Sequence, residues 1–375
     1  MLCTDMEETE MGNQNLWHPE ENRMRVFLDK LKASKIPVVL YGAGDCGMRY
    51  HHVLTDAGIP ILAYIDDAKA KQGTMAGLPV WSMAEAKEHA EKTDFIILIS
   101  SYGPSKLYPN LVKAGLSDRW RWSEFYLWED GLDYVAYFAE HKDEITAAYR
   151  LMNDDRSREV FRNLLQYKIS RDIRLIEAVN DNGTEAQYFA SDIIRYEDDE
   201  VFVDLGAYIG DTVKVFEEKM KEHGKRVKGV YAFEPDEKTF RRLQQNTSGY
   251  GHVSCINKGA YSENTVLHFA SQGFWTSSFS EQGDMEVPVC SLDSEIQGNV
   301  TFLKADIEGS EKAAVHGGGT LISCWQPKIA FCVYHKKEDI FTLPLMLAKL
   351  NPHYKFYMRH YSELPVESVV YAISE

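Results

Sequence analysis

The stretch VFVDLGAYIGD, residues 201–211, decides the fold of the second half of the chain. An apolar, β-branched run leads into Asp204, and Gly206 and Gly210 follow before a helical stretch begins. Gly206 allows a sharp turn close to a ligand, and Gly210 allows a second close approach where the helix opens. Asp204 places a carboxylate at the carboxyl end of the strand, where ligands of open parallel sheets bind. The stretch therefore predicts a strand, a ligand-binding loop and a helix.

A second acid follows at the end of the next predicted strand. The run YAFEP places Glu234 28 residues after Gly206, and Pro235 then stops the strand. A carboxylate at this point accepts both hydroxyls of an adenosine ribose. The loop is spaced more widely than the G-x-G-x-x-G of a pyrophosphate cradle, and Asp204 beside it suits an ammonium group, which S-adenosylmethionine carries. The alternative is that Asp204 and Glu234 are only exposed acids at strand ends.

Strand and helix signals alternate through the rest of this half, as in a parallel sheet covered by helices. Helices are expected to about residue 223, over 238–246, after Gly309 and over 339–350, and strands over 227–233, 253–257, 301–305 and 328–334. A β-rich insertion at 266–270 and 285–289 interrupts this order. The last two runs, 354–358 and 368–373, have no helix between them and predict a β-hairpin at the sheet edge.

A shorter alternation occupies the first part of the chain. Its expected elements are a helix at 23–32, strands at 37–41, 59–65 and 94–100, a helix ending at Ala57 and a helix at 108–114. The loop GAGDCG, residues 42–47, and Asp66, nineteen residues past Gly47, fit the dinucleotide-binding motif. The segment is too short for a six-stranded doubly wound sheet. Nucleotide or nucleotide-sugar binding, NAD binding, and a scaffold or oligomerisation role all stay open.

Five segments of the second half together carry a family resemblance. VFVDLGAYIGDT, YAFEPD, INKGAYSE, FLKADIEGSE and FCVYHKKEDI, in this order and spacing, resemble the FkbM-type S-adenosylmethionine-dependent O-methyltransferases, a branch of the class I methyltransferases. The resemblance covers residues 185–375 and implies a Rossmann-like fold with an antiparallel terminal strand. It also implies methyl transfer to a hydroxyl. The resemblance implies that Asp204, Gly206, Ala207 and Gly210 hold the methionine moiety, Glu234 the ribose, and Gly259 and Ala260 the adenine. Asp211 and Pro235 are expected to bind the cofactor as well.

The whole chain is therefore expected to be α/β, with two Rossmann-like domains. The limits predicted are 21–122 for a small domain with the GxGxxG loop, 123–196 for a helical connector and 197–375 for a class I, FkbM-like methyltransferase domain. The helical segment is dense in charge and has apolar residues at helical spacing. Residues 66–81 resemble the small Rossmann-like domains that are attached to sugar-modifying enzymes.

The chemistry is expected around FLKADIEGSE. Asp306 ends the fourth strand, with Glu308 and Glu311 just beyond it at the start of a helix. Methyl transfer to a hydroxyl needs removal of a proton, so Asp306 is the first candidate for a general base or orienting acceptor. His335, at the end of the next strand, is the second candidate, because a pKa near 6.5 suits proton acceptance. The alternatives are that Glu308 and Glu311 only cap the helix and that His335 has a structural role. Asp306 and Glu308 have the oxygen ligands that Mg²⁺ prefers, but no metal is predicted.

The acceptor side is less defined. Aromatic and hydroxyl residues of the β-rich insertion can stack on a sugar or hydrogen-bond it; these are Phe274, Trp275, Ser277 and Ser278. Tyr188 and Phe189 are expected to close the site from the other side. Arg359 and His360, after the penultimate strand, are further candidates for the acceptor side.

Composition limits the partners. The 41 basic residues stand against 57 acidic ones, a formal net charge of −16, which disfavours a nucleic-acid partner. The six cysteines form no CxxC pair, the first fifteen residues lack the pattern of a signal peptide, and no apolar run suits a membrane span. We expect a cytoplasmic enzyme acting on a small-molecule or glycan acceptor, without membrane partners. A nitrogen acceptor, an NAD-linked or nucleotide-sugar-binding oxidoreductase or sensor, and a homo-oligomer stay open.

Overall fold

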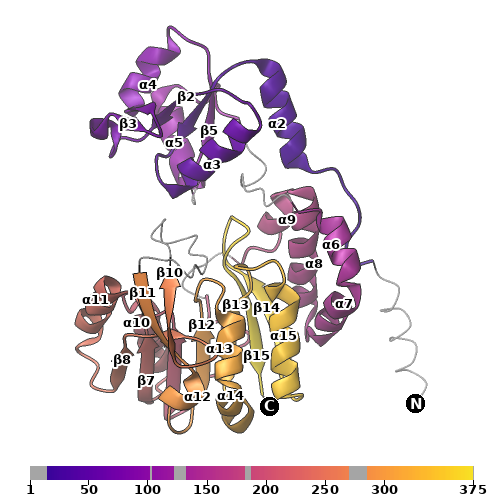
Figure 1. The fold of residues 1–375 in the computed structure, drawn as a ribbon, viewed down its shortest axis with the longest axis vertical. Helices are drawn as coiled ribbons and strands as arrows, with labels where there is room; N and C mark the ends of the chain where they lie inside the picture. Colours follow the sequence, from indigo (N-terminus) through magenta and orange to yellow (C-terminus); the bar gives the residue numbers. More distant parts are fainter. Residues whose placement is uncertain (1–14, 102–103, 122–131, 182–186, 270–284, 375) are drawn as a thin grey trace. The chain divides into compact units, whose positions relative to one another are not determined.

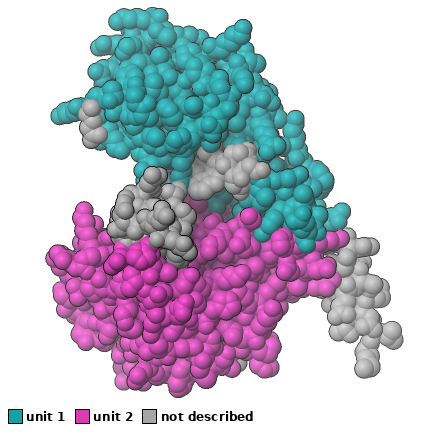
Figure 2. All heavy atoms as spheres, in the orientation of Figure 1, with its two compact units in different colours: residues 1–140, 162–178, 363–365 teal, residues 141–161, 179–362, 366–375 magenta. Residues whose placement is uncertain are grey.

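The structure, a computed structural model, describes residues 15–101, 104–121, 132–181, 187–269 and 285–374. Its contacts divide the chain into two compact units, which Figure 2 colours separately. The first comprises Met1–Glu140, Arg162–Ala178 and Glu363–Pro365, and the second comprises His141–Phe161, Val179–Ser362 and Val366–Glu375. The α/β class and the two Rossmann-like sheets predicted from the sequence are confirmed. The predicted limits at residues 122 and 196 stay a prediction.

The first unit is built on a five-stranded sheet in the order β3-β4-β2-β1-β5. Its strands are β1 (Val38–Tyr41), β2 (Ile61–Ile65), β3 (Thr74–Met75), β4 (Leu78–Trp81) and β5 (Ile96–Ile99). All pairs are parallel except β3 with β4. The helices around it are α2 (Arg23–Ser34), α3 (Asp45–Asp56), the 3-10 turn η1 (Ala70–Gln72), α4 (Met83–Ala90) and α5 (Pro104–Ala114). The fully buried β1 therefore lies between two parallel neighbours, as its apolar run requires.

The sequence missed the short turn η1, the strands β3 and β4, and the helix α4 of this unit. The strands β3 and β4 lie in a polar, glycine-containing segment, and each is too short to show a clear alternation. The helix α4 begins at a capping box, in which the Ser82 hydroxyl accepts from the Glu85 N–H and the Glu85 carboxylate accepts from the Ser82 N–H. This box was a readable signal for a helix start.

The described part of the segment between the two sheets along the chain contains four helices. They are α6 (Tyr134–Glu140), α7 (Lys142–Leu151), α8 (Asp155–Ser170) and α9 (Arg174–Glu177). The expected helical character is confirmed. The contacts assign this segment partly to each unit, with α8 divided between them.

The second unit is built on a seven-stranded sheet in the order β14-β15-β13-β12-β6-β7-β8 (Figure 1). Its strands are β6 (Glu200–Leu205), β7 (Val227–Phe233), β8 (Val253–Ile256), β12 (Phe302–Ala305), β13 (Lys328–Cys332), β14 (Lys355–His360) and β15 (Ser368–Ile373). Six of them run in one direction, and β15 runs antiparallel to its two neighbours, β13 and β14. The predicted antiparallel hairpin at the edge is confirmed.

The helices predicted in this unit are present, together with one turn over Leu292–Glu295 that was not predicted. They are α10 (Asp211–Glu222), α11 (Glu237–Thr247), α12 (Leu292–Glu295), α13 (Glu311–Gly317), α14 (Gly319–Trp325) and α15 (Asp339–Leu350). The β-rich insertion forms a separate three-stranded sheet from β9 (Gly259–Ala260), β10 (Thr265–Phe269) and β11 (Met285–Cys290). The helix expected after Gly309 is interrupted at Gly318, which separates α13 from α14.

An aromatic core fixes the centre of the large sheet. Phe202 on β6 and Phe302 on β12 are register partners, with ring centroids 5.2 Å apart. Phe216 of α10 stacks on Phe202 at 4.5 Å, and Phe189 packs against the same group. Burial of such rings is the main stabilising contribution available here. The strands that carry the predicted site are thus held rigidly beneath it.

No helix among the residues that the structure describes is both long enough and apolar enough to cross a membrane.

Candidate functional site

Three neighbouring strands of the large sheet end in register. Leu205, the last residue of β6, pairs with Phe233 on β7 and with Ala305 on β12, and both of these are also last residues. The next residue of each strand belongs to the predicted site: Gly206, Glu234 and Asp306. The parallel sheet therefore brings together three segments that lie far apart in the sequence.

Two glycines of the first loop stand where a side chain does not fit. Gly206 has a φ of +78°, and a Cβ built on it would lie 2.0 Å from the backbone oxygen of Asp306. Gly210 has a φ of +86° and precedes α10; its Cβ would lie 3.0 Å from Thr247 and 3.1 Å from Leu243 of α11. The loop between them can thus approach β12 on one side and α11 on the other.

The neighbours of these glycines are placed by the backbone. The N–H groups of Gly206 and the buried Ala207 both donate to the carbonyl of Phe233, at 3.1 and 2.9 Å, which ties the loop to the end of β7. Asp211 is the first residue of α10 and is exposed. An acid in this position complements the positive end of the helix dipole.

Asp204 does not face solvent. It is fully buried, and its Oδ1 lies 2.9 Å from Nζ of Lys304, its register partner on β12. The same Nζ donates to the carbonyls of Leu205 and Gly206 at 3.2 and 2.9 Å. Burial lowers the pKa of Lys304, but the carboxylates of Asp204 and Asp306 raise it by more, so the ammonium stays charged. The idea that Asp204 is merely an exposed strand-end acid is wrong; its contact with a ligand stays a prediction.

Glu234 is largely buried, and its Oε1 accepts from the N–H of Asp236 at 2.8 Å. Burial raises the pKa of this carboxyl to about 7. The side-chain amide of Asn257, just after β8, donates to the carbonyls of Glu234 and Pro235 at 2.8 and 3.1 Å. The turn that carries the predicted ribose acid is therefore held from the neighbouring strand.

Gly259 and Ala260 lie beside this turn. They form β9, which pairs in parallel with Val289 and Cys290 of the insertion sheet. A Cβ on Gly259 would lie 3.2 Å from a side-chain carbon of Val289 and 3.8 Å from Cβ of Pro235. The structure thus places the segment predicted to pass the adenine next to the segment predicted to hold the ribose.

Asp306 collects hydrogen-bond donors from two tyrosines. Its Oδ2 accepts from the Tyr188 hydroxyl at 2.8 Å, and its Oδ1 accepts from the Tyr334 hydroxyl at 3.3 Å. Burial raises the pKa of Asp306, but Lys304, His335 and the Tyr188 hydroxyl together lower it below the ordinary value. The carboxylate is thus held in its ionised, accepting form.

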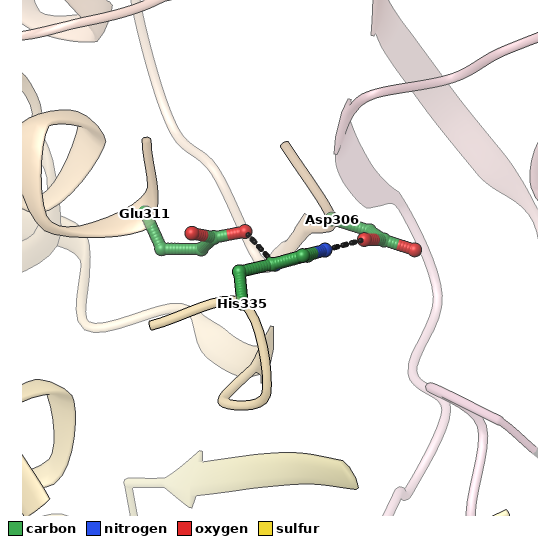
Figure 3. A group of neighbouring side chains, drawn as sticks. All are labelled: Asp306, Glu311 and His335. Atoms are coloured by element: carbon green, nitrogen blue, oxygen red, sulfur yellow. Dashed lines mark ion pairs between the residues drawn. The ribbon is translucent and has the colours of Figure 1, made fainter. Parts of the chain in front are cut away.

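His335 lies between three carboxylates, two of which Figure 3 shows. Its Nε2 is 3.3 Å from Oδ1 of Asp306 and 3.6 Å from Oε2 of Glu308, and its Nδ1 is 2.9 Å from Oε1 of Glu311. Burial lowers the pKa of His335, but the ion pair with Glu311 and the charges of Asp306 and Glu308 raise it to about 9. The expectation that His335 accepts a proton rested on the unperturbed pKa near 6.5, which the three surrounding acids raise; its role in the chemistry stays a prediction.

The two glutamates after Asp306 have different surroundings. Glu311 is fully buried at the start of α13, and its Oε1 also accepts from the Ile307 N–H at 3.0 Å. The side chain of Glu308 is 52% exposed, its φ is +54°, and burial of its carboxyl raises the pKa to about 7. Glu311 thus accepts a hydrogen bond from the backbone before α13 and also pairs with His335. Glu308 lies on the solvent side of these acids.

Sequence reasoning missed several side chains of the site. Gln187 donates to the Glu367 carboxylate, which also accepts from the Tyr334 hydroxyl at 3.5 Å. Lys304 was missed as well. A lysine inside the apolar run FLKA and a tyrosine directly before His335 were the available signals, since both stand next to predicted site residues on predicted strands.

The side chains predicted to face the acceptor differ in where the structure places them. His360 is fully buried, with both ring nitrogens bonded to Ser368 and Ser362, and Arg359 pairs with Asp154 and Asp192. These side chains hold β14 in place, so their predicted role toward an acceptor is wrong. Tyr188 reaches Asp306, as described above, while Phe189 belongs to the aromatic core. Phe274, Trp275, Ser277 and Ser278 lie outside the described residues.

In the first unit, the Asp66 carboxylate binds backbone N–H groups of the glycine loop and of its own turn. Oδ2 of Asp66 accepts from the Ala43 N–H at 3.1 Å, and Oδ1 accepts from the N–H groups of Ala68 and Lys69 at 3.0 and 3.1 Å. A Cβ on Gly47 would lie 2.2 Å from the carbonyl oxygen of Gly42, whereas nothing lies within 4 Å of the Gly44 position. Asp66, the expected ribose acid of an NAD site, is committed to backbone donors.

Comparison with known proteins bears on the second unit and on the fold. The family model of the methyltransferase FkbM domain matches residues 204–360. No curated protein matches the chain. The crystal structure of methyltransferase FkbM from Methylobacillus flagellatus covers 97% of this chain and 96% of its own, with 20% identity and a TM-score of 0.69, a likeness that shows a shared fold.

Two other solved structures are similar to about half of the chain. An rRNA methylase from Streptococcus thermophilus covers 48% of this chain and 89% of its own, with 13% identity and a TM-score of 0.32. Fibrillarin from Aeropyrum pernix, solved with natively bound S-adenosyl-L-methionine, covers 50% of this chain and 73% of its own, with 12% identity and a TM-score of 0.32.

Proposed function

We propose that this chain, whose residues 204–360 match the family model of the methyltransferase FkbM domain, transfers the methyl group of S-adenosylmethionine to a hydroxyl of a sugar, glycan or other small metabolite.

The observation that carries the proposal is the alignment of the three strand ends. Glu234 stands beside the Gly206 loop, so a carboxylate suited to ribose hydroxyls adjoins a backbone cradle that a side chain would fill. The donor set fits S-adenosylmethionine: Glu234 and Pro235 for the ribose, the loop from Gly206 to Gly210 for the methionine moiety, and Gly259 for the adenine. When bound, the cofactor supplies an electrophilic methyl group on a sulfonium.

The chain's own residues prepare the acceptor. Asp306 follows the strand next to the Gly206 loop, and its ionised carboxylate can orient an acceptor hydroxyl and take its proton as the C–O bond forms and the C–S bond breaks. The Tyr188 and Tyr334 hydroxyls hold that carboxylate in place. Glu308, on the solvent side, faces the approach of the acceptor.

The charge of this group favours a neutral polyol. Asp306 and Glu308 offer hydrogen-bond acceptors to hydroxyl groups and would repel a phosphorylated or carboxylated acceptor. A nitrogen acceptor is the second candidate, because the same acids attract a cationic amine.

A methyl-transfer assay tests the proposal. The full chain is incubated with methyl-labelled S-adenosylmethionine and matched pairs of neutral sugars and amino sugars, and products are identified by mass spectrometry. O-methylated product that disappears in Asp306→Asn supports the proposal. N-methylated product alone overturns the hydroxyl assignment, and absence of labelled product across sugars, glycans and small polyols overturns the acceptor class.

A further inference from the structure

His335 has an unusual environment for a histidine at a predicted methyl-transfer site. Its side chain is only 9% exposed, and among the described residues neither ring nitrogen makes a hydrogen bond of normal geometry. Instead, Nε2 points toward Asp306 and Nδ1 lies beside Glu311 (Figure 3). Asp306, Glu311 and His335 each offer a ligand atom within 4.8 Å of the other two.

The spacing on the Nε2 side matches that of atoms sharing one ion. Oδ1 of Asp306 and Oε2 of Glu308 lie 3.3 and 3.6 Å from Nε2. Ligands bound to one divalent metal at about 2.1 Å are separated by about 3.0 Å at a right angle and about 3.6 Å at 120°. Each of the two carboxylate oxygens therefore lies at the distance from Nε2 that two ligands of one ion have.

The Nδ1 side supplies what a metal-binding histidine needs. Such a histidine usually presents its other nitrogen to a carboxylate, which fixes the ring and raises its basicity. Glu311 occupies this position 2.9 Å from Nδ1, is fully buried, and is itself held by the Ile307 N–H.

The balance of charge points the same way. Asp306, Glu308 and Glu311 bring three carboxylates to one imidazole, so the four side chains carry a net negative charge even when His335 is protonated. The ammonium of Lys304 is paired with Asp204. Concentrated negative charge of this kind is stabilised by a cation. One imidazole with two carboxylates suits a divalent ion of the first transition row.

We propose that Nε2 of His335, Oδ1 of Asp306 and Oε2 of Glu308 bind a divalent transition-metal ion, with Glu311 as the carboxylate that orients His335. Because Glu308 is half exposed, the remaining coordination positions open toward solvent, where acceptor hydroxyls can bind. The role toward the acceptor rests on the proposed function; binding of the ion does not.

The test is a Mn²⁺ titration of the full chain after treatment with EDTA and dialysis. Free Mn²⁺ is read by electron paramagnetic resonance. We expect one Mn²⁺ per chain, affinity weakened at least about tenfold in Glu308→Gln and His335→Gln, and about 10–100-fold in Glu311→Gln. The matched control is His252→Gln, which removes a histidine paired with a single carboxylate, Glu217, and leaves Mn²⁺ binding unchanged.

Two results would overturn the proposal: no binding of Mn²⁺ or Zn²⁺ at millimolar concentration, or binding that Glu308→Gln leaves unchanged. Glu308→Gln decides the matter if His335→Gln does not fold, because Glu308 is half exposed and its replacement leaves the buried side chains in place. Binding is read without cofactor or acceptor. Failure here therefore leaves methyl transfer untouched, and failure of methyl transfer leaves the ion site testable.

Discussion

Lys304 and Asp204 face each other on adjacent strands and form a 2.9 Å ion pair that is closed to solvent. The lysine also binds two carbonyls at the start of the glycine loop. The pair thus connects the stability of the sheet to the shape of the loop predicted to hold the cofactor.

Replacing Lys304 by methionine leaves the Asp204 carboxylate buried without its partner. Loss of one member of a buried pair costs about 3–5 kcal/mol. We expect a loss of this size in the free energy of unfolding, measured by urea denaturation. The control is Lys258→Met, which removes a partly exposed pair with Glu295 and costs about 1 kcal/mol or less. Equal effects of the two variants would contradict the account.

Gly206→Ala introduces a Cβ 2.0 Å from the Asp306 carbonyl oxygen at a φ of +78°. The loop must then move away from β12, in addition to backbone strain of about 1–3 kcal/mol. We expect lower stability and weaker S-adenosylhomocysteine binding. Gly249→Ala is the control, since its Cβ would meet nothing within 4 Å. Unchanged stability and binding in Gly206→Ala would show that the loop does not need this close approach.

Asp306→Asn removes the accepting charge and keeps the shape of the side chain. Turnover is expected to fall about 10²–10⁴-fold, the usual contribution of a general base. Affinity for S-adenosylhomocysteine should stay within a few-fold, because Glu234 and the Gly206 loop lie on other strands. Turnover and S-adenosylhomocysteine affinity are measured on the same preparation. Loss of turnover with intact affinity assigns Asp306 to the chemistry and not to cofactor binding. Normal turnover in this variant would remove Asp306 from the chemistry.

Cofactor binding should depend on pH through Glu234. Burial raises the pKa of this carboxyl to about 7, although the hydrogen bond from the Asp236 N–H and the charge of Lys304 lower it. The ionised form accepts two ribose hydroxyls, so affinity is full above this pKa and falls as the pH drops through it, by up to about tenfold per unit. S-adenosylhomocysteine titrations from pH 8.5 to 5.5 measure the profile. Glu234→Gln should bind weakly and without this dependence; a steep profile in the variant would assign it to another group.

Much of the fold followed from local signals. Strands such as β7 and β15 were predicted with their observed bounds, because an apolar run ends at Pro235 in one case and at the chain's last residues in the other. The glycine loop and Glu234 were identified because their chemistry is local to two strand ends.

The environment of the catalytic candidates could not be read in this way. The ionisation of His335 depends on Asp306, Glu308 and Glu311, whose distances are set by β12, β13 and α13 packing together. The buried lysine looked like an ordinary strand residue until register placed it opposite Asp204. Arg359 and His360 seemed functional in sequence because polar residues that fix a hairpin resemble polar residues that bind a ligand.

Calorimetric titration of the full chain with S-adenosylhomocysteine and with NAD, in the wild type, Glu234→Ala and Asp66→Asn, tests the central claim most directly. Two charge-assisted hydrogen bonds contribute about 3 kcal/mol or more, so their loss weakens binding about 100-fold. The account predicts one S-adenosylhomocysteine per chain, bound about 100-fold more weakly in Glu234→Ala and unchanged in Asp66→Asn. Binding of NAD that Asp66→Asn abolishes, with no binding of S-adenosylhomocysteine, would contradict it.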